Sequence, residues 1–165
     1  MRLEVQLTKR ADGSVVMRCT REDGSVTWQK HEKHAAFYSF HDLTHFAVET
    51  VLGFAEGFYG LVANGWSIED TTGKGVRGKP PEEAIVVEHV VGLFDRERSG
   101  GGAVLEATQF SALLEQMTGL KLKRAFTDHQ LTAVRARIAE LHEKWVSIPE
   151  GSSLYLTFEG VNLLD

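Results

Sequence analysis

Apolar and polar residues alternate along the beginning of the chain. Three runs share this pattern, residues 2–8, 15–21 and 25–30. Alternation with a period of two is typical of a half-buried strand. The runs are separated by Asp12-Gly13 and Asp23-Gly24. Asp-Gly between such runs indicates a tight hairpin, because glycine accepts the positive φ of the turn. The pattern predicts a three-stranded antiparallel meander over residues 1–31.

The apolar period changes to about 3.6 in the middle of the chain, which predicts a helical segment over residues 39–146. Capping residues, prolines and glycines divide this segment into four expected helices, at about 40–62, 80–98, 107–117 and 128–148. Ser39 with Asp42, and Thr127 with Gln130, have the spacing of a capping box. Residues 152–160 alternate again and predict a final strand.

This order of elements predicts an α+β fold. We expect a three-stranded antiparallel meander plus a C-terminal strand, with one face of the sheet covered by about four helices, because a one-faced sheet must bury its apolar side. The 165 residues suit a single domain, 1–165. Within it, residues 66–79 are expected to form a flexible loop between the first and second helices.

The first expected helix carries the candidate chemistry. Residues four apart lie above one another on a helix, so His41, His45 and Glu49 share a ridge that continues through Gly53 and Gly57. The other faces are apolar, which predicts a central helix. An unpaired buried carboxylate costs several kcal/mol, so Glu49 needs a partner. That partner is either His45 or a divalent cation, and imidazole with carboxylate suits zinc, iron, manganese or nickel.

Glycines suggest where a second helix approaches. The first expected helix contains Gly53, Gly57 and Gly60. Each costs up to about 1 kcal/mol relative to alanine inside a helix, a cost that close packing of another element would offset. The second helix offers Gly92, and a crossing there would bring His89 or Glu88 near Glu49. The candidate metal ligands are therefore His41, His45, Glu49 and His89.

Residues 41–45, His-Asp-Leu-Thr-His, resemble the metal-binding His-Glu-x-x-His motif of zinc peptidases. Asp42 stands where those enzymes have their general base. It is one methylene shorter than glutamate and is also expected to complete the helix cap, so peptidase activity is not inferred. Asp42 and Glu49 are the candidate catalytic carboxylates. His31 and His34 precede the helix in a charged stretch and are expected to be solvated, the alternative being that they supply further ligands.

Residues 73–79, GKGVRGK, have the G-x-x-x-x-G-K spacing of a phosphate-binding loop. Pro80 stands where that loop needs a serine or threonine for magnesium, so a nucleotide site is not predicted. The stretch instead predicts a cationic loop, with Lys74, Arg77 and Lys79, before a helix N-terminus, where anions are favoured. We expect either a lid over an anionic ligand or a solvated linker.

Composition narrows the classes of function. The formal net charge is −5, with the excess acid concentrated in residues 35–100. Nucleic acid is therefore not an expected partner, because phosphate contacts need basic surface. Cys19 is the only cysteine, which excludes a disulfide framework and a cysteine-rich metal cluster. No apolar run reaches the roughly 18 residues of a membrane span and none suggests a secretion signal, so we expect a cytoplasmic protein without a membrane partner.

Two hypotheses of different classes follow. The first is a divalent-metal or acid/base site on the first helix that acts on an unknown small molecule, with metal-dependent hydrolysis as the reaction class. The second is a non-enzymatic interaction module, or a homodimeric assembly module, in which the same histidines and glycines serve packing. The sequence alone does not decide whether the protein is an enzyme.

Overall fold

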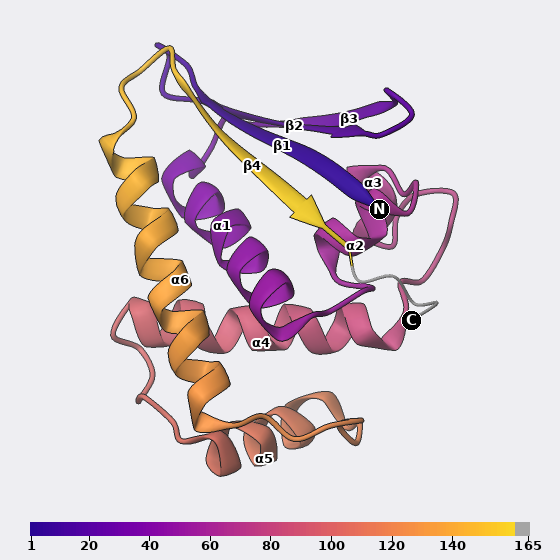
Figure 1. Ribbon diagram of the computed structural model, residues 1–165, viewed down its shortest axis with the longest axis vertical. Helices are drawn as coiled ribbons and strands as arrows, with labels where there is room; N and C mark the ends of the chain where they lie inside the picture. Colours follow the sequence, from indigo (N-terminus) through magenta and orange to yellow (C-terminus); the bar gives the residue numbers. More distant parts are fainter. Residues whose placement is uncertain (161–165) are drawn as a thin grey trace.

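A four-stranded antiparallel sheet lies over a helical layer in the computed structural model, which describes residues 1–160 (Figure 1). Its strands are β1 (Arg2–Lys9), β2 (Val15–Arg21), β3 (Val26–His31) and β4 (Ser153–Glu159). The order is β3-β2-β1-β4, so the last strand returns to pair with the first. The predicted α+β class, the meander and the returning strand are confirmed.

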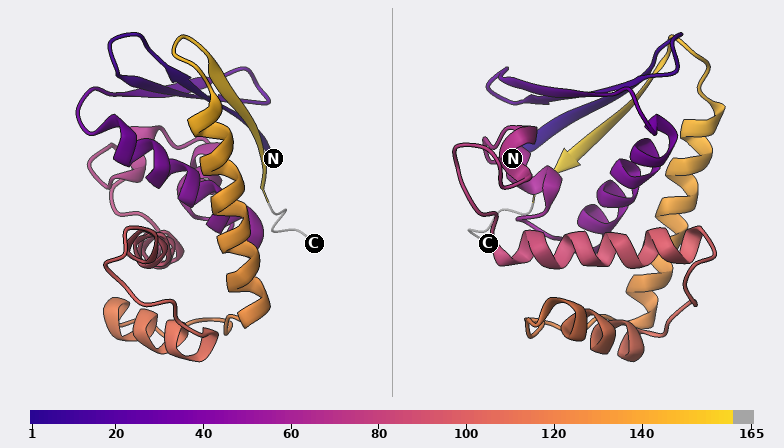
Figure 2. Two further views of the ribbon diagram at one scale, coloured as in Figure 1. Left: turned by 90° about the vertical axis from the view of Figure 1, so that its left-hand side faces the viewer. Right: turned by 180° about the vertical axis from the view of Figure 1, so that it is seen from behind.

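Six helices fill the region between β3 and β4. They are α1 (Ala35–Leu52), α2 (Phe58–Ala63), α3 (Ile68–Thr71), α4 (Glu82–Arg98), α5 (Ala107–Thr118) and α6 (Asp128–Ser147). α1 lies beneath the sheet with α6 beside it, and α4 packs against α1 farther from the sheet (Figure 1). Along the described chain, the opposite face of the sheet carries no helix (Figure 2). Within residues 1–160 we find no helix with both the length and the apolarity to cross a bilayer.

The apolar face of the sheet forms one side of the core. Val5 lies opposite Cys19 on β2 and opposite Leu156 on β4, and all three side chains are buried. Residues in register across a sheet point to the same face, so this row packs onto the helices. Phe46 of α1 contacts the sheet through Phe158, with ring centroids 6.2 Å apart. The core thus fixes α1 firmly against the sheet.

The start of α1 differs from the prediction. The helix begins at Ala35, after His34 turns the chain with φ 56°. Ser39 does not cap the helix: it is buried in the second turn, and its hydroxyl donates to the carbonyl of Ala35 at 2.7 Å. A serine inside a helix can satisfy its hydroxyl on the carbonyl four residues earlier, so the capping spacing was misleading.

The end of α1 also differs. The helix stops at Leu52 and not at Val62, because Gly53 adopts the left-handed conformation and its N–H donates to the carbonyl of Glu49. Glycine is the usual residue for this helix ending, since it has no Cβ to clash. The chain then reverses and continues as the short helix α2. The ridge therefore ends near Glu49, and Gly57 does not continue it.

The segment 66–79 is not wholly a loop, because it contains the short helix α3 with a capping box formed by Ser67 and Asp70. The last three helices agree with the prediction. α4, α5 and α6 lie close to the expected ranges. The capping box at the start of α6 is present, with Thr127 and Gln130 satisfying each other's backbone N–H groups. In these segments the local signals and the tertiary packing point to the same structure.

Candidate metal centre

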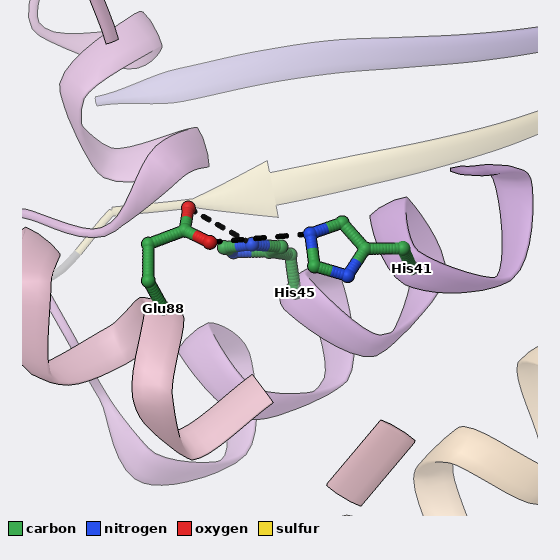
Figure 3. Close-up of side chains that lie close together, drawn as sticks. All are labelled: His41, His45 and Glu88. Atoms are coloured by element: carbon green, nitrogen blue, oxygen red, sulfur yellow. Dashed lines mark ion pairs between the residues drawn. The ribbon is translucent and has the colours of Figure 1, made fainter. Parts of the chain in front are cut away.

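Two histidines of α1 and one glutamate of α4 meet at the crossing of these helices (Figure 3). His41 and His45 are four residues apart, so both imidazoles project from the same side of α1. Nε2 of His45 lies 3.2 Å from Oε1 of Glu88, and Nε2 of His41 lies 3.9 Å from Oε2. One donor atom from each of the three residues lies within 4.8 Å of the other two.

These separations suit a shared cation. Nitrogen and oxygen ligands lie about 2.0–2.2 Å from zinc, so three of them around one ion are roughly 3–3.5 Å apart. Because the ligand atoms are up to 4.8 Å apart, the widest separation must shorten by roughly 1–2 Å to reach that geometry. The Glu88 side chain is 57% exposed and can supply the movement, while His45 is 4% exposed and held in place.

Two further carboxylates orient the histidines. Nδ1 of His41 lies 2.7 Å from Oδ2 of Asp95, and Nδ1 of His45 lies 3.2 Å from Oε1 of Glu49. An ionised carboxylate only accepts hydrogen bonds, so each Nδ1 donates. The Nε2 atom of each ring faces Glu88, and its lone pair would be the one that binds an ion. Metal-binding histidines commonly show this pattern, because a carboxylate on the second nitrogen fixes the tautomer and raises ligand basicity.

The chain reversal after α1 brings two backbone N–H groups against the Glu49 carboxylate. This residue is 1% exposed, and its Oε2 accepts N–H groups of Tyr59 at 2.9 Å and Gly60 at 3.2 Å. Gly57 leaves the necessary room, because a Cβ there would lie 2.7 Å from Oε2 of Glu49. The glycines that were expected to admit a neighbouring helix serve instead to end α1 and to admit this carboxylate.

The carboxylates also set the proton affinity of His45. Burial disfavours its charged form, but hydrogen bonds to Glu49 and Glu88 outweigh burial and raise its pKa to about 10. Burial raises the pKa of Glu49, against the opposing effect of its hydrogen bond from His45. Burial alone would raise the pKa of Glu88, but the contacts with the histidines outweigh it and hold this pKa below its usual value. A proton on Nε2 of His45 thus occupies the place that a cation would take.

The local charge balance favours a cation. Glu49, Glu88 and Asp95 supply three carboxylates around two imidazoles. A partial counter-charge comes from Arg98, whose Nη2 lies 3.6 Å from Oδ1 of Asp95. In the absence of an ion, the proton on His45 supplies the other part of the counter-charge, and a bound cation would replace it. A divalent ion compensates the carboxylate charge without protonating either ring.

The structure brings together only part of the expected ligand set. His41 and His45 belong to the group, whereas Glu49 contacts the far nitrogen of His45. His89 is outside the group: its Nδ1 lies 2.8 Å from the carbonyl oxygen of Ile85. Glu88, its neighbour, occupies the position facing α1.

Sequence reasoning missed Asp95. It lies seven residues after Glu88, which is two helical turns, so both side chains share a face of α4. A carboxylate repeated at that spacing is a signal, but it gains meaning only when the histidines of α1 are known to lie opposite. Thr44 also contacts Asp95, through Oγ1 at 3.4 Å from Oδ1.

Asp42 faces away from the group. Its Oδ2 lies 2.9 Å from Nε2 of His31, and the His31 ring stacks on Tyr38 with centroids 5.1 Å apart. The expectation that His31 is solvated was wrong, since its side chain is only 12% exposed. The catalytic role of Asp42 stays a prediction, and its hydrogen-bond partner is the histidine from β3.

The cationic loop does not converge on the start of α4. Lys74 and Lys79 are exposed, while Arg77 folds back onto the carbonyl of Gly65 at 3.2 Å and the carboxylate of Asp70 at 3.7 Å. The first turn of α4 already contains acidic residues. The anion site at Lys74, Arg77 and Lys79 therefore stays a prediction without supporting geometry.

Comparisons with protein-family models, curated proteins and solved structures find no match to this chain.

Proposed function

We propose that the protein binds a divalent transition metal ion through His41, His45 and Glu88. The observation that carries this proposal is the direction of the two imidazoles: both Nε2 atoms face Glu88, and both Nδ1 atoms face other carboxylates. Two imidazoles and one carboxylate suit zinc, and also iron, manganese or nickel.

The ligand number favours a reactive ion over a structural one. Structural zinc sites use four protein ligands, whereas catalytic sites commonly use three and leave a position for water. His41 and Glu88 also line an open groove, so solvent and a substrate can reach the ion from that side. His45 closes the opposite side, where it is buried.

We propose hydrolysis as the reaction class. A bound zinc ion lowers the pKa of its water to about 7, which generates a nucleophile at neutral pH. Such a water would attack the acyl carbon of a substrate, the bond to the leaving group would break, and the leaving group would take up the proton that the water loses. Glu49 and Asp95 keep the imidazoles oriented during this reaction and do not reach the substrate.

Metal titration tests the proposal. Protein without a histidine tag is stripped with a chelator and titrated with zinc by calorimetry, and we expect one ion per chain. Glu88→Gln and His45→Asn should each weaken binding at least tenfold. His89→Asn is the matched control, because it removes the histidine next to Glu88 that the group does not use.

The results separate the two hypotheses. Binding that is lost in Glu88→Gln and kept in His89→Asn supports the metal site. Metal-free protein that forms a stable homodimer and takes up no zinc would instead favour the assembly module. Equal binding by wild-type protein and Glu88→Gln would also contradict the proposal.

A further inference from the structure

An open groove of about 570 Å³ lies beside the metal group. Its walls include Phe37, Gly92, Arg96 and Met117, together with the ligands His41 and Glu88. This volume is within the range of small-molecule sites, roughly 300–1,000 Å³. Phe37 stacks on the His41 ring with centroids 6.0 Å apart, so the apolar wall is continuous with the proposed ion.

Gly92 lines the groove. It lies within α4, where glycine costs about 1 kcal/mol relative to alanine. Apart from its chain neighbours and the adjacent backbone of α4, no heavy atom of residues 1–160 lies within 4 Å of the place where a Cβ would be, so packing against other segments does not require glycine. The expected close crossing at Gly92 is therefore wrong. The missing side chain leaves space in the groove instead.

Two apolar side chains that line the groove are accessible. Phe37 is 51% exposed and Met117 is 41% exposed, although both are large apolar side chains. Exposed apolar surface that lines a concavity favours a ligand with an apolar portion. Phe37 comes from α1 and Met117 from α5, so the groove spans three helices.

The charges around the groove indicate which polar group the ligand carries. A divalent ion together with Arg98 would balance the three carboxylates of the group. Arg96 then supplies the uncompensated charge of the groove, because it forms no ion pair with any residue in the range 1–160. One free guanidinium matches one carboxylate, which it can bind through two hydrogen bonds.

We infer that the groove binds a small monocarboxylic acid with an aromatic or branched aliphatic group. The apolar group lies over Gly92 between Phe37 and Met117, and the carboxylate pairs with Arg96. An ester or amide bond elsewhere in the same molecule is then placed beside the ion. The inference names the substrate class of the proposed hydrolytic site and rests on that proposed function.

Binding of 3-phenylpropanoate to zinc-loaded protein tests the inference. Calorimetry should detect one molecule per chain, with much weaker binding of acetate, which lacks the apolar group, and of 3-phenylpropanamide, which lacks the charge. Arg96→Gln should raise Kd at least tenfold. Arg137→Gln is the matched control, because it removes a surface arginine of α6 that pairs with Glu140 outside the groove.

Substitutions at Gly92 test the position. Gly92→Leu should fill the groove and abolish binding of 3-phenylpropanoate, whereas Gly92→Ala should weaken it only a fewfold. Zinc titration and thermal unfolding of each variant check that the ion site and the fold are kept.

The two proposals fail in different ways. If zinc binds but 3-phenylpropanoate binds equally to wild-type protein, Arg96→Gln and Gly92→Leu, the groove inference is overturned and the metal site stands. If wild-type protein takes up no zinc, the proposed function fails. Titration of metal-free protein with 3-phenylpropanoate then tests the groove alone. If metal-free wild-type protein and Arg96→Gln bind 3-phenylpropanoate equally, or neither binds it, the inference is overturned as well.

Discussion

His45 and Glu88 approach each other to 3.2 Å between Nε2 and Oε1, although they lie far apart in the sequence. One partner is a buried imidazole and the other an exposed carboxylate. The contact therefore joins the interior of the protein to its surface. An ion at this point would be held firmly by α1 and remain accessible along α4.

Glu49→Gln should weaken zinc binding by about 10- to 100-fold although all three proposed ligands remain. The amide oxygen can still accept the N–H groups of Tyr59 and Gly60, so the amide nitrogen faces His45. It then donates to Nδ1 and forces the proton onto Nε2, where it blocks the ion. Zinc calorimetry gives the affinity, and unchanged affinity would argue against an orienting role for Glu49.

Asp42→Asn should leave zinc affinity within about threefold of wild type. Asp42 contacts His31 and lies outside the metal group. The resemblance of residues 41–45 to a zinc-peptidase motif would give Asp42 a catalytic role, so the variant also separates binding from hydrolysis. A large loss of zinc in Asp42→Asn, with the fold retained by circular dichroism, would require a different ligand arrangement.

Gly57→Ala should destabilise the protein by about 1–3 kcal/mol. The added Cβ would overlap the Glu49 carboxylate, which is buried and held by backbone N–H groups. Gly92→Ala serves as the opposite case, because its Cβ would meet no neighbour and the helix should gain up to about 1 kcal/mol. Urea unfolding measures both free energies. Equal effects of the two substitutions would be inconsistent with the described packing around Glu49.

Cys19 should resist thiol reagents in the folded protein. Burial raises its pKa to about 12, and the nearby Asp42 charge acts in the same direction. Between pH 9 and 12 the unfolded chain loses the thiol proton while the folded chain keeps it. This difference lowers stability as pH rises through that window. Reaction with a thiol reagent at pH 8 should occur only after unfolding, and rapid reaction of native protein would contradict the burial of β2.

The pH effect can be isolated with Cys19→Ala. Because alanine has no titrating group, the variant should lose less stability than wild type between pH 9 and 12, after correction for its lower stability at pH 7. The same slope in both proteins would show that other groups cause the alkaline loss.

The sheet and the later helices could be predicted because their signals are local. Alternation and Asp-Gly turns determine the meander, and the capping box of Thr127 and Gln130 determines the start of α6. The i,i+4 spacing of His41 and His45 likewise needs only the helix itself. These parts of the fold and site depend on neighbours within a few residues.

The rest of the site depends on packing between distant segments. Glu88 and His89 are adjacent, and they point about 100° apart around a helix, so the rotation of α4 against α1 decides which one faces His45. Gly53 could continue a helix or end it, and the choice depends on the reversal that returns Tyr59 and Gly60 to Glu49. The pattern of apolar residues predicts neither the angle at which α4 crosses α1 nor the chain reversal after Gly53.

Anomalous diffraction from crystals of the zinc-loaded protein at the zinc absorption edge tests the central claim most directly. We predict a single strong peak about 2.0–2.2 Å from Nε2 of His41, Nε2 of His45 and a carboxylate oxygen of Glu88. A zinc peak bound only by other residues, or no peak between α1 and α4 at full zinc loading, would contradict the account.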